Sequence, residues 1–256
     1  MRVAVVTGAA QGIGRRTAQV LGEAGYNLLL LDLQSCEATL SALPATGFEA
    51  EALIGDIADG SLIAQAAELV MQRWGRVDVL VNNAGISFIA PAEMTEASAF
   101  RRVLEINLVA PFVLSRIFGS IMLEQREGSI VNVASIAGLV GVSDRSIYNA
   151  SKHGLVGLTR TLAGEWGGRG VRVNAVCPGW VKTEMDVADQ VGGGYTDDDI
   201  TGRVPMARFA RPDDIARAIL FLADPSQSGF VNGHALAVDG GWTADGSWQS
   251  LRMHKR

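Results

Sequence analysis

Tyr148 and Lys152 lie four residues apart in the segment SIYNASKHG, which has the pattern of a helix. At that spacing their side chains share one helix face, one turn apart. A free phenol has a pKa near 10, about three units too high for a good base at neutral pH, and a neighbouring cation favours the phenolate. The pair could therefore act as an acid or base. The alternative is a chance pairing on a solvated helix face.

A glycine-rich segment, TGAAQGIG, places Gly8, Gly12 and Gly14 in a G-x-x-x-G-x-G pattern after the first apolar run. Glycine lets the backbone turn tightly and approach a pyrophosphate, whose charge is favoured by the free N–H groups of a following helix. Such a segment alone could be only a tight turn. Its place between the first expected strand and the first expected helix predicts a dinucleotide-binding site.

Asp32 ends the second apolar run, 18 residues after Gly14. From there its carboxylate can accept hydrogen bonds from both hydroxyls of an adenosine ribose, whereas it would repel a 2′-phosphate. The following Leu33 and Gln34, and Gln11 in the glycine segment, offer no cation to that phosphate. These charges predict NAD rather than NADP as the cofactor.

Short apolar runs alternate with amphipathic stretches that end in glycine or begin with proline and acidic residues, as helices do. This alternation predicts an α/β fold, a single domain with a doubly wound parallel sheet of about seven strands and helices on both faces. In such sheets ligands bind beyond the carboxyl ends of the strands, where the strand order reverses. The expected strands lie at 2–6, 27–31, 48–53, 77–81, 129–134, 171–176 and 235–238.

The composition excludes several classes of partner. With 256 residues, 48% of them hydrophobic, the chain can form one α/β domain with a sizeable core. The net charge is −5 and the basic residues are spread along the chain, so no nucleic acid is expected as a partner. The first apolar run is too short for a signal peptide, and no run of 18 apolar residues predicts a membrane span, so no membrane partner is expected.

The two cysteines, Cys36 and Cys177, are far apart, and the three histidines are scattered. This pattern predicts a cytoplasmic protein with reduced thiols and no metal site. Cys177 ends an apolar run with no histidine near it in sequence, so we interpret it as a buried thiol rather than a nucleophile.

The chain resembles the short-chain dehydrogenase/reductase family from Arg2 to about Trp242. The resemblance implies a Rossmann-type catalytic domain over residues 1–242, and the C-terminal tail at 243–256 departs from the usual family ending. The motifs occur in the family's order, with Ser135 lying 13 residues before Tyr148. They are TGAAQGIG, GDI with Asp56, NNAG at 82–85, Asn107 in EINLVAPF, Ser135 in NVASIAG, the Tyr148–Lys152 pair, and PGWVKT at 178–183.

The resemblance implies a catalytic role for four residues. Tyr148 would be the acid or base, and Lys152 would hold the nicotinamide ribose and, with the cationic ring of the oxidised cofactor, lower the pKa of that phenol. Ser135 would hydrogen-bond the substrate oxygen, and Asn107 would position a water that links Lys152 to solvent. For Asn82 we favour a structural role, tying neighbouring strands together.

The expected cofactor contacts follow the ends of the strands. The resemblance places the GDI motif near the adenine, the NNAG motif behind the cofactor and the PGWVKT motif beside the nicotinamide. The predicted NAD-binding residues are Gly8, Gln11, Gly12, Ile13, Gly14, Asp32, Leu33, Asp56, Ile57, Asn83, Ala84, Gly85, Tyr148, Lys152, Pro178, Gly179, Val181 and Thr183.

The activity implied is NAD(H)-dependent interconversion of a secondary alcohol, such as a sugar, polyol or hydroxy acid, and the corresponding ketone. One alternative is a 3-oxoacyl-(acyl-carrier-protein) reductase-like ketoreductase, for which Arg169 and Arg172 could contribute a basic surface; Asp32 and the acidic balance weigh against it. Another is a non-catalytic NAD-sensing or interaction protein on the same fold. The four intact catalytic positions weigh against that alternative.

Residues around the small-molecule substrate are expected to vary within the family. The segment 184–205, which includes GGGYTDDD, is predicted to be a lid, with a disordered loop as the alternative. The resemblance also implies a homotetramer, paired through helices near 97–122 and 146–166. The other residues expected near the substrate are Ser87, Phe88, 136–142, Asp144, Arg145 and Trp180.

Overall fold

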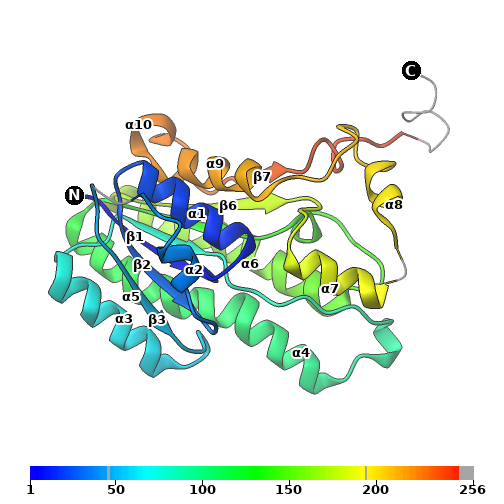
Figure 1. Cartoon of the computed structure of the whole chain (residues 1–256), viewed down its shortest axis with the longest axis horizontal. Helices are drawn as coiled ribbons and strands as arrows, with labels where there is room; N and C mark the ends of the chain where they lie inside the picture. Colours follow the sequence, from blue (N-terminus) through cyan, green and yellow to red (C-terminus); the bar gives the residue numbers. More distant parts are fainter. Residues whose placement is uncertain (45–46, 194, 248–256) are drawn as a thin grey trace.

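The computed structural model describes residues 1–44, 47–193 and 195–247. Seven parallel strands form one sheet in the order β3-β2-β1-β4-β5-β6-β7, with helices on both faces, which confirms the predicted Rossmann-type fold (Figure 1). Each strand falls on or beside one of the expected apolar runs. The strands are β1 Val3–Thr7, β2 Asn27–Asp32, β3 Ala50–Ile54, β4 Val79–Asn82, β5 Gly128–Val133, β6 Val171–Pro178 and β7 Ala235–Val238.

The helices form two layers, because alternate residues of each strand face opposite sides of the sheet. In β1, Ala4 and Val6 pack on the layer that contains α1 and α9, whereas Val3 and Val5 pack on the layer that contains α3, α5 and α6. The helices are α1 Gly12–Glu23, α2 Glu37–Leu40, α3 Gly60–Trp74, α4 Ala97–Leu104, α5 Ala110–Gln125, α6 Ser146–Trp166, α7 Glu184–Gly193, α8 Asp197–Thr201, α9 Pro212–Ala223 and α10 Pro225–Ser228.

The strand order reverses at β1, which pairs with β2 on one side and with β4 on the other. After β1 the chain adds β2 and β3 on one side of it, and then returns to add β4 to β7 on the other side. The connections that leave β1 and β4 therefore run in opposite directions. A crevice at the carboxyl ends of these strands is the expected result. The helices α7 and α8 lie at this end of the sheet (Figure 1).

The helices α4 and α5 are joined by a π-helical turn at Glu105–Val109 into one continuous helix, Ala97–Gln125. By length and composition it could cross a membrane, but half of its most apolar 18-residue stretch is buried inside the protein. Leu114, Phe118 and Met122 pack in the core under the sheet. That packing accounts for the apolar composition of the helix.

The segment predicted as a lid forms two helices, α7 and α8, within its described part; Gly194 of the glycine run lies outside the described residues. The first residues of the expected C-terminal tail contact the rest of the domain through Arg203. Arg203 stacks over Trp242 and forms an ion pair with Asp245, with 3.5 Å between Nη1 and Oδ2. Residues 248–256 of the tail lie outside the described residues.

Candidate active site

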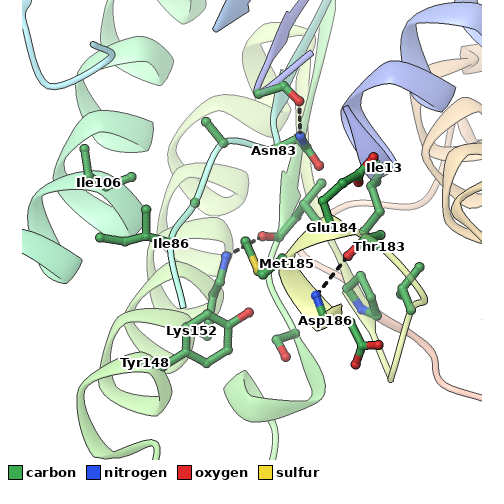
Figure 2. A pocket seen from close by; sticks show the side chains of 18 of the residues that line it. Ile13, Asn83, Ile86, Ile106, Tyr148, Lys152, Thr183, Glu184, Met185 and Asp186 are labelled. Atoms are coloured by element: carbon green, nitrogen blue, oxygen red, sulfur yellow. Dashed lines mark hydrogen bonds between the residues drawn. The ribbon is translucent and has the colours of Figure 1, made fainter. Parts of the chain in front are cut away.

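A cavity of about 440 Å³ opens at the carboxyl ends of the strands, and it gathers residues from segments that are far apart in the sequence (Figure 2). All of the predicted catalytic and cofactor-binding residues line it except Gly14 and Asn107. Among the residues expected near the substrate, Arg145 and Trp180 line it, whereas Phe88 and the exposed Asp144 do not.

The glycine-rich loop is packed too closely for side chains at two positions. Gly8 has a φ of +65°, and a Cβ there would lie 2.8 Å from the Cα of Ala84. A Cβ on Gly14 would overlap the carbonyl oxygen of Gly8, so Gly14 lies behind the cavity wall and holds the helix close to the loop. The side-chain amide of Asn83 donates to the carbonyl oxygens of Thr7 and Gly8 at 2.9 and 3.0 Å. This cradle, at the start of α1, fits a pyrophosphate.

Asp32 ends β2 at the same side of the cavity. Its Oδ2 accepts from the N–H of Ala10 at 2.8 Å, and its Oδ1 accepts from the N–H of Gln34 at 2.8 Å. The carboxylate therefore ties the second strand to the glycine loop while it faces the cavity. Leu33, which also lines the cavity, is 67% exposed. The nearby guanidinium of Arg15 is bound to the carbonyl oxygen of Ala10, with 3.0 Å between Nε and oxygen.

Arg102 is a cavity residue that the sequence analysis missed. It lines the end of the cavity formed by Asp56 and Ile57, and its Nη2 lies 2.8 Å from Asp56 Oδ2. The hydrogen bond from Arg102 lowers the pKa of Asp56 below its usual range. In sequence Arg102 is one of two adjacent arginines on an amphipathic helix, so only its position against the GDI motif distinguishes it.

Tyr148 and Lys152 lie on one face of α6, and both point into the cavity (Figure 2). Lys152 Nζ lies 5.6 Å from the centroid of the Tyr148 ring and donates to the carbonyl oxygen of Val133 at 2.9 Å. Ser135, just after β5, forms a side-chain hydrogen bond with Tyr148. This convergence in one cavity argues against a chance pairing on a solvated face.

In the protein without cofactor, burial dominates the ionisation of this pair. Burial raises the pKa of Tyr148, and the hydrogen bond from Ser135 and the charge of Arg145 offset only part of that rise. Burial also lowers the pKa of the Lys152 ammonium, to about 8. In the protein alone, desolvation therefore outweighs the neighbouring charges, and the phenol stays protonated at neutral pH.

Asn107 lies in the π-helical turn and is fully buried. Its Oδ1 accepts from the N–H of Ile86 at 2.9 Å, and its Nδ2 donates to the Ile86 carbonyl at 3.0 Å and to Ser151 Oγ at 3.2 Å. A Cβ on Gly85 would lie 3.2 Å from Asn107 Oδ1 and 3.6 Å from Lys152 Nζ. Asn107 therefore holds the segment after β4 close to Lys152, from behind the cavity wall.

The neighbouring Asn82 has the structural role that the sequence favours. Its side-chain amide donates to Asn132 Oδ1 at 2.8 Å and to Ser115 Oγ at 3.1 Å. These bonds tie β4 to β5 and to α5.

The PGWVKT motif forms the opposite wall of the cavity. Gly179 is packed so closely on the segment after β7 that a Cβ would lie 2.8 Å from the Cα of Asp239. Thr183 lies at the start of α7, where its Oγ1 accepts from the N–H of Asp186 at 3.4 Å (Figure 2). The first residues of α7, Glu184 to Asp186, also line the cavity, so this motif and the predicted lid are one continuous wall.

Neither cysteine belongs to the cavity. Cys36 and Cys177 are buried and unpaired, and burial raises the pKa of each thiol to about 11. Such thiols are poor nucleophiles, as the sequence interpretation of Cys177 expects. Within residues 1–44, 47–193 and 195–247, no group of three or more histidine, cysteine or acidic side chains could hold a metal ion.

Comparison with known proteins agrees with this geometry. A family model described as enoyl-(acyl carrier protein) reductase matches residues 8–243. A D-threitol dehydrogenase from Mycolicibacterium smegmatis is 39% identical over 244 residues, which cover 94% of this chain and 93% of that protein. A 3-oxoacyl-[acyl-carrier-protein] reductase from Synechocystis sp. is 34% identical over 243 residues, covering 94% of this chain and 96% of that protein.

Among solved structures, a provisionally assigned NAD(P)-dependent gluconate 5-dehydrogenase from Beutenbergia cavernae, with NADP bound at low occupancy, superposes with a TM-score of 0.88. It is 44% identical, and the match covers 95% of this chain and 97% of that one. The parallel sheet, the ordered motifs and these likenesses lead to one conclusion: the chain is an oxidoreductase of the short-chain dehydrogenase/reductase family.

Proposed function

We propose that the protein interconverts a secondary alcohol and its ketone with NAD(H), in a cavity where Tyr148 is the acid or base. The observation that carries this proposal is that Tyr148, Ser135 and Lys152 line the same cavity as the glycine cradle and Asp32. Figure 2 shows Tyr148 and Lys152 in this cavity. When bound, NAD supplies the hydride acceptor. The protein supplies binding, orientation and a group that holds the proton.

The roles of the side chains follow from their positions. In the oxidation direction Tyr148 takes the proton of the substrate hydroxyl at its phenolic oxygen, while Ser135 hydrogen-bonds the same substrate oxygen. The Lys152 ammonium favours the phenolate form of Tyr148, and the positive charge of an oxidised nicotinamide acts in the same direction. Burial raises the pKa of Tyr148 in the protein alone, so we expect the base to form only when both positive charges face it.

NAD is the proposed cofactor because Asp32 lines the cavity beside Leu33 and Gln34, which carry no positive charge. Arg15 and Arg102 are already engaged, Arg15 with the carbonyl oxygen of Ala10 and Arg102 with Asp56. The NADP in the Beutenbergia structure makes the choice worth testing directly. Leu33→Arg places a cation on a 67% exposed side chain beside Asp32. We expect it to raise the ratio of kcat/KM with NADP to kcat/KM with NAD by about ten-fold, because one charge-assisted hydrogen bond to the 2′-phosphate contributes about that factor. Met94→Arg, on a 73% exposed side chain outside the cavity, is the control and should leave the ratio unchanged.

The activity itself is tested with a panel of alcohols, polyols, hydroxy acids and ketones, assayed with NAD(H) and NADP(H) in both directions. We expect turnover of secondary alcohols with NAD and a preference for NADH over NADPH. Absence of turnover with every substrate and both cofactors would contradict the proposal.

A 3-oxoacyl-(acyl-carrier-protein) reductase is the second candidate, since such an enzyme from Synechocystis sp. is 34% identical. The two arginines considered for carrier-protein docking lie at the wrong end of the sheet. Arg172 is the second residue of β6, about 20 Å along that strand from Pro178 at the cavity. Its Nη1 donates to Ser228 Oγ at 3.1 Å, so it is already engaged within the domain. The panel includes a 3-oxoacyl thioester to test this candidate.

We also propose a cytoplasmic homotetramer. The continuous helix 97–125 leaves Phe100, Val109 and Phe112 between 37% and 44% exposed, which suits a helix packed on a second copy. A tetramer needs a second contact, and the fully exposed Phe230, near β7, offers one. Light scattering should give about four chain masses. A fully active monomer would contradict the proposal.

The cytoplasmic location is proposed because both cysteines are buried and unpaired, which suits a reducing compartment.

A further inference from the structure

An ion pair lies in the cavity wall on the substrate side, between the start of α6 and the lid helix α7. Arg145 Nη1 and Asp189 Oδ2 are 3.0 Å apart, and their side chains are only 10% and 17% exposed. Ser87 holds the pair from behind: its Oγ accepts from Arg145 Nη1 at 3.0 Å and donates to Asp189 Oδ2 at 2.9 Å. Arg145 and Asp189 both line the cavity that contains Tyr148.

The position of Arg145 is not explained by the stability of α6. It precedes the first residue of that helix, where a cation is disfavoured by the helix dipole. Asp144 before it has a φ of +59°, and its carbonyl oxygen accepts from the N–H of Ala90 at 2.8 Å. This constrained backbone directs a buried guanidinium to a place three residues from Tyr148. A function in the cavity accounts for that arrangement.

Both residues of the pair have hydrogen-bonding capacity left over and line the cavity. Both bonds to Asp189 are made by Oδ2, and Oδ1 accepts none from the residues that the structure describes. A guanidinium has five N–H donors; Nη1 of Arg145 bonds Ser87 and Asp189, and a further side-chain hydrogen bond joins Arg145 to Tyr195, which leaves donors over. Trp180, another cavity residue, adds a flat apolar surface: the guanidinium carbon of Arg145 lies over its ring, 5.3 Å from the centroid. The wall thus presents an acceptor and donors side by side.

We propose that Arg145 and Asp189 form a subsite for a second hydroxyl of the substrate, which makes the substrate a neutral polyol or sugar rather than a hydroxy acid. A hydroxyl can donate to Asp189 Oδ1 and accept from Arg145 without breaking the pair. A carboxylate would have to displace Asp189 or approach it, and the same helix also presents Glu184 and Asp186 to the cavity. This inference rests on the proposed function and narrows its substrate class.

Three four-carbon substrates isolate the second hydroxyl: butane-2,3-diol, butan-2-ol and 3-hydroxybutanoate, each assayed with NAD. A site built to bond a hydroxyl rejects the analogue that lacks it. We expect kcat/KM for the diol to exceed that for butan-2-ol and for 3-hydroxybutanoate by at least about ten-fold, given the strength of a hydrogen bond to a charged group. A preference for 3-hydroxybutanoate, or equal use of the diol and butan-2-ol, would overturn the inference.

The variant Asp189→Asn keeps the shape of the side chain and removes its charge. We expect kcat/KM for the diol to fall about ten-fold or more, that for butan-2-ol to stay within two-fold, and that for 3-hydroxybutanoate to rise. Ser87→Ala should also lower kcat/KM for the diol, by a smaller factor than Asp189→Asn does. The matched control is Asp198→Asn, on the exposed face of α8 outside the cavity, which should change none of the three. An equal loss for all three substrates in Asp189→Asn would overturn the inference.

A binding measurement separates this inference from the proposed function. Calorimetric titration of the diol into the NADH-saturated protein should give binding that Asp189→Asn weakens and Asp198→Asn does not. That result without turnover would contradict the proposed function and leave the subsite in place. Turnover of butan-2-ol with no difference in diol binding between Asp189→Asn and the unaltered protein would overturn the subsite and leave the proposed function in place. Titration of NADH itself should give the same affinity in all variants.

Discussion

The two ends of the cavity are held in different ways. At the cofactor end, the glycine loop is fixed through its own backbone: the N–H of Gly8 donates to the Leu31 carbonyl at 2.8 Å, Asp32 and Asn83 bond backbone groups of the loop, and a Cβ on Gly14 would overlap it. At the substrate end, side-chain ion pairs help to hold α7 and α8, such as Lys182 with Asp197 at 2.6 Å and Arg145 with Asp189 at 3.0 Å. Backbone packing tolerates almost no change, whereas ion pairs can be exchanged residue by residue. A single fold can in this way keep one cofactor site and vary its substrates.

The largest effect should come from the residue between the two ends. Tyr148→Phe keeps the ring and removes the ionisable oxygen, so we expect turnover to fall by about 10²- to 10⁴-fold while NADH affinity is retained. Steady-state kinetics and fluorescence titration measure both. Tyr26→Phe makes the same chemical change outside the cavity and should leave turnover unchanged. Activity of Tyr148→Phe within a few-fold of the unaltered enzyme would rule out the phenol as acid or base.

At the cofactor end, Gly14→Ala should weaken NADH binding and lower the thermal stability together. The added Cβ overlaps the Gly8 carbonyl oxygen, so the loop must move, at a cost of about 1–3 kcal/mol. That cost corresponds to roughly ten- to hundred-fold in affinity if it falls on the cradle. Gly60→Ala, where a Cβ meets nothing within 4 Å, is the control. Unchanged NADH affinity in Gly14→Ala would show that the cradle is less constrained than its packing indicates.

A pH titration tests the phenol in the protein alone. Burial raises the pKa of all three tyrosines, that of Tyr195 to about 12. Because the folded pKa values lie above the unfolded value near 10, these phenols contribute stability below pH 10 that is lost as the pH rises through the folded values. The ultraviolet absorbance of the folded, cofactor-free protein should show no tyrosinate below pH 10, whereas the denatured protein should titrate near 10. A signal at lower pH that vanishes in Tyr148→Phe would mean that Lys152 alone suffices to lower that pKa.

The smallest effect is expected at the substrate end, in the lid. Thr196 caps α8 with its Oγ1, which accepts from the N–H of Asp199 at 3.3 Å, and the Asp199 carboxylate accepts from the N–H of Thr196 at 2.8 Å. Thr196→Ala should cost about 1 kcal/mol, confined to this helix. Hydrogen exchange should become faster over residues 197–201, with NADH affinity and the exchange of β1 unchanged. A global loss of stability would show that the lid is part of the cooperative core and is held no more loosely than the glycine loop.

The sequence alone determined the sheet and most of the cavity wall, for a physical reason. Buried parallel strands must be apolar on both faces, so they appear as short apolar runs, and ligand-binding residues must follow them at the carboxyl ends. The glycine loop, Asp32 and Ser135 follow this local logic, and the Tyr148–Lys152 pair shows in the spacing of one helix turn. Their chemistry is therefore visible in the order of residues along the chain.

Only the tertiary structure decided which charged side chains meet and how far they are removed from water. Arg102 meets Asp56 across 46 residues, and Arg145 meets Asp189 across 44, from segments whose sequences give no sign of a partner. In the protein without cofactor the pKa of Tyr148 is raised, because burial, which spacing along a helix cannot reveal, outweighs the neighbouring charges. Desolvation and long-range pairing depend on the whole packed fold, and they set the ionisation and the substrate end of this site.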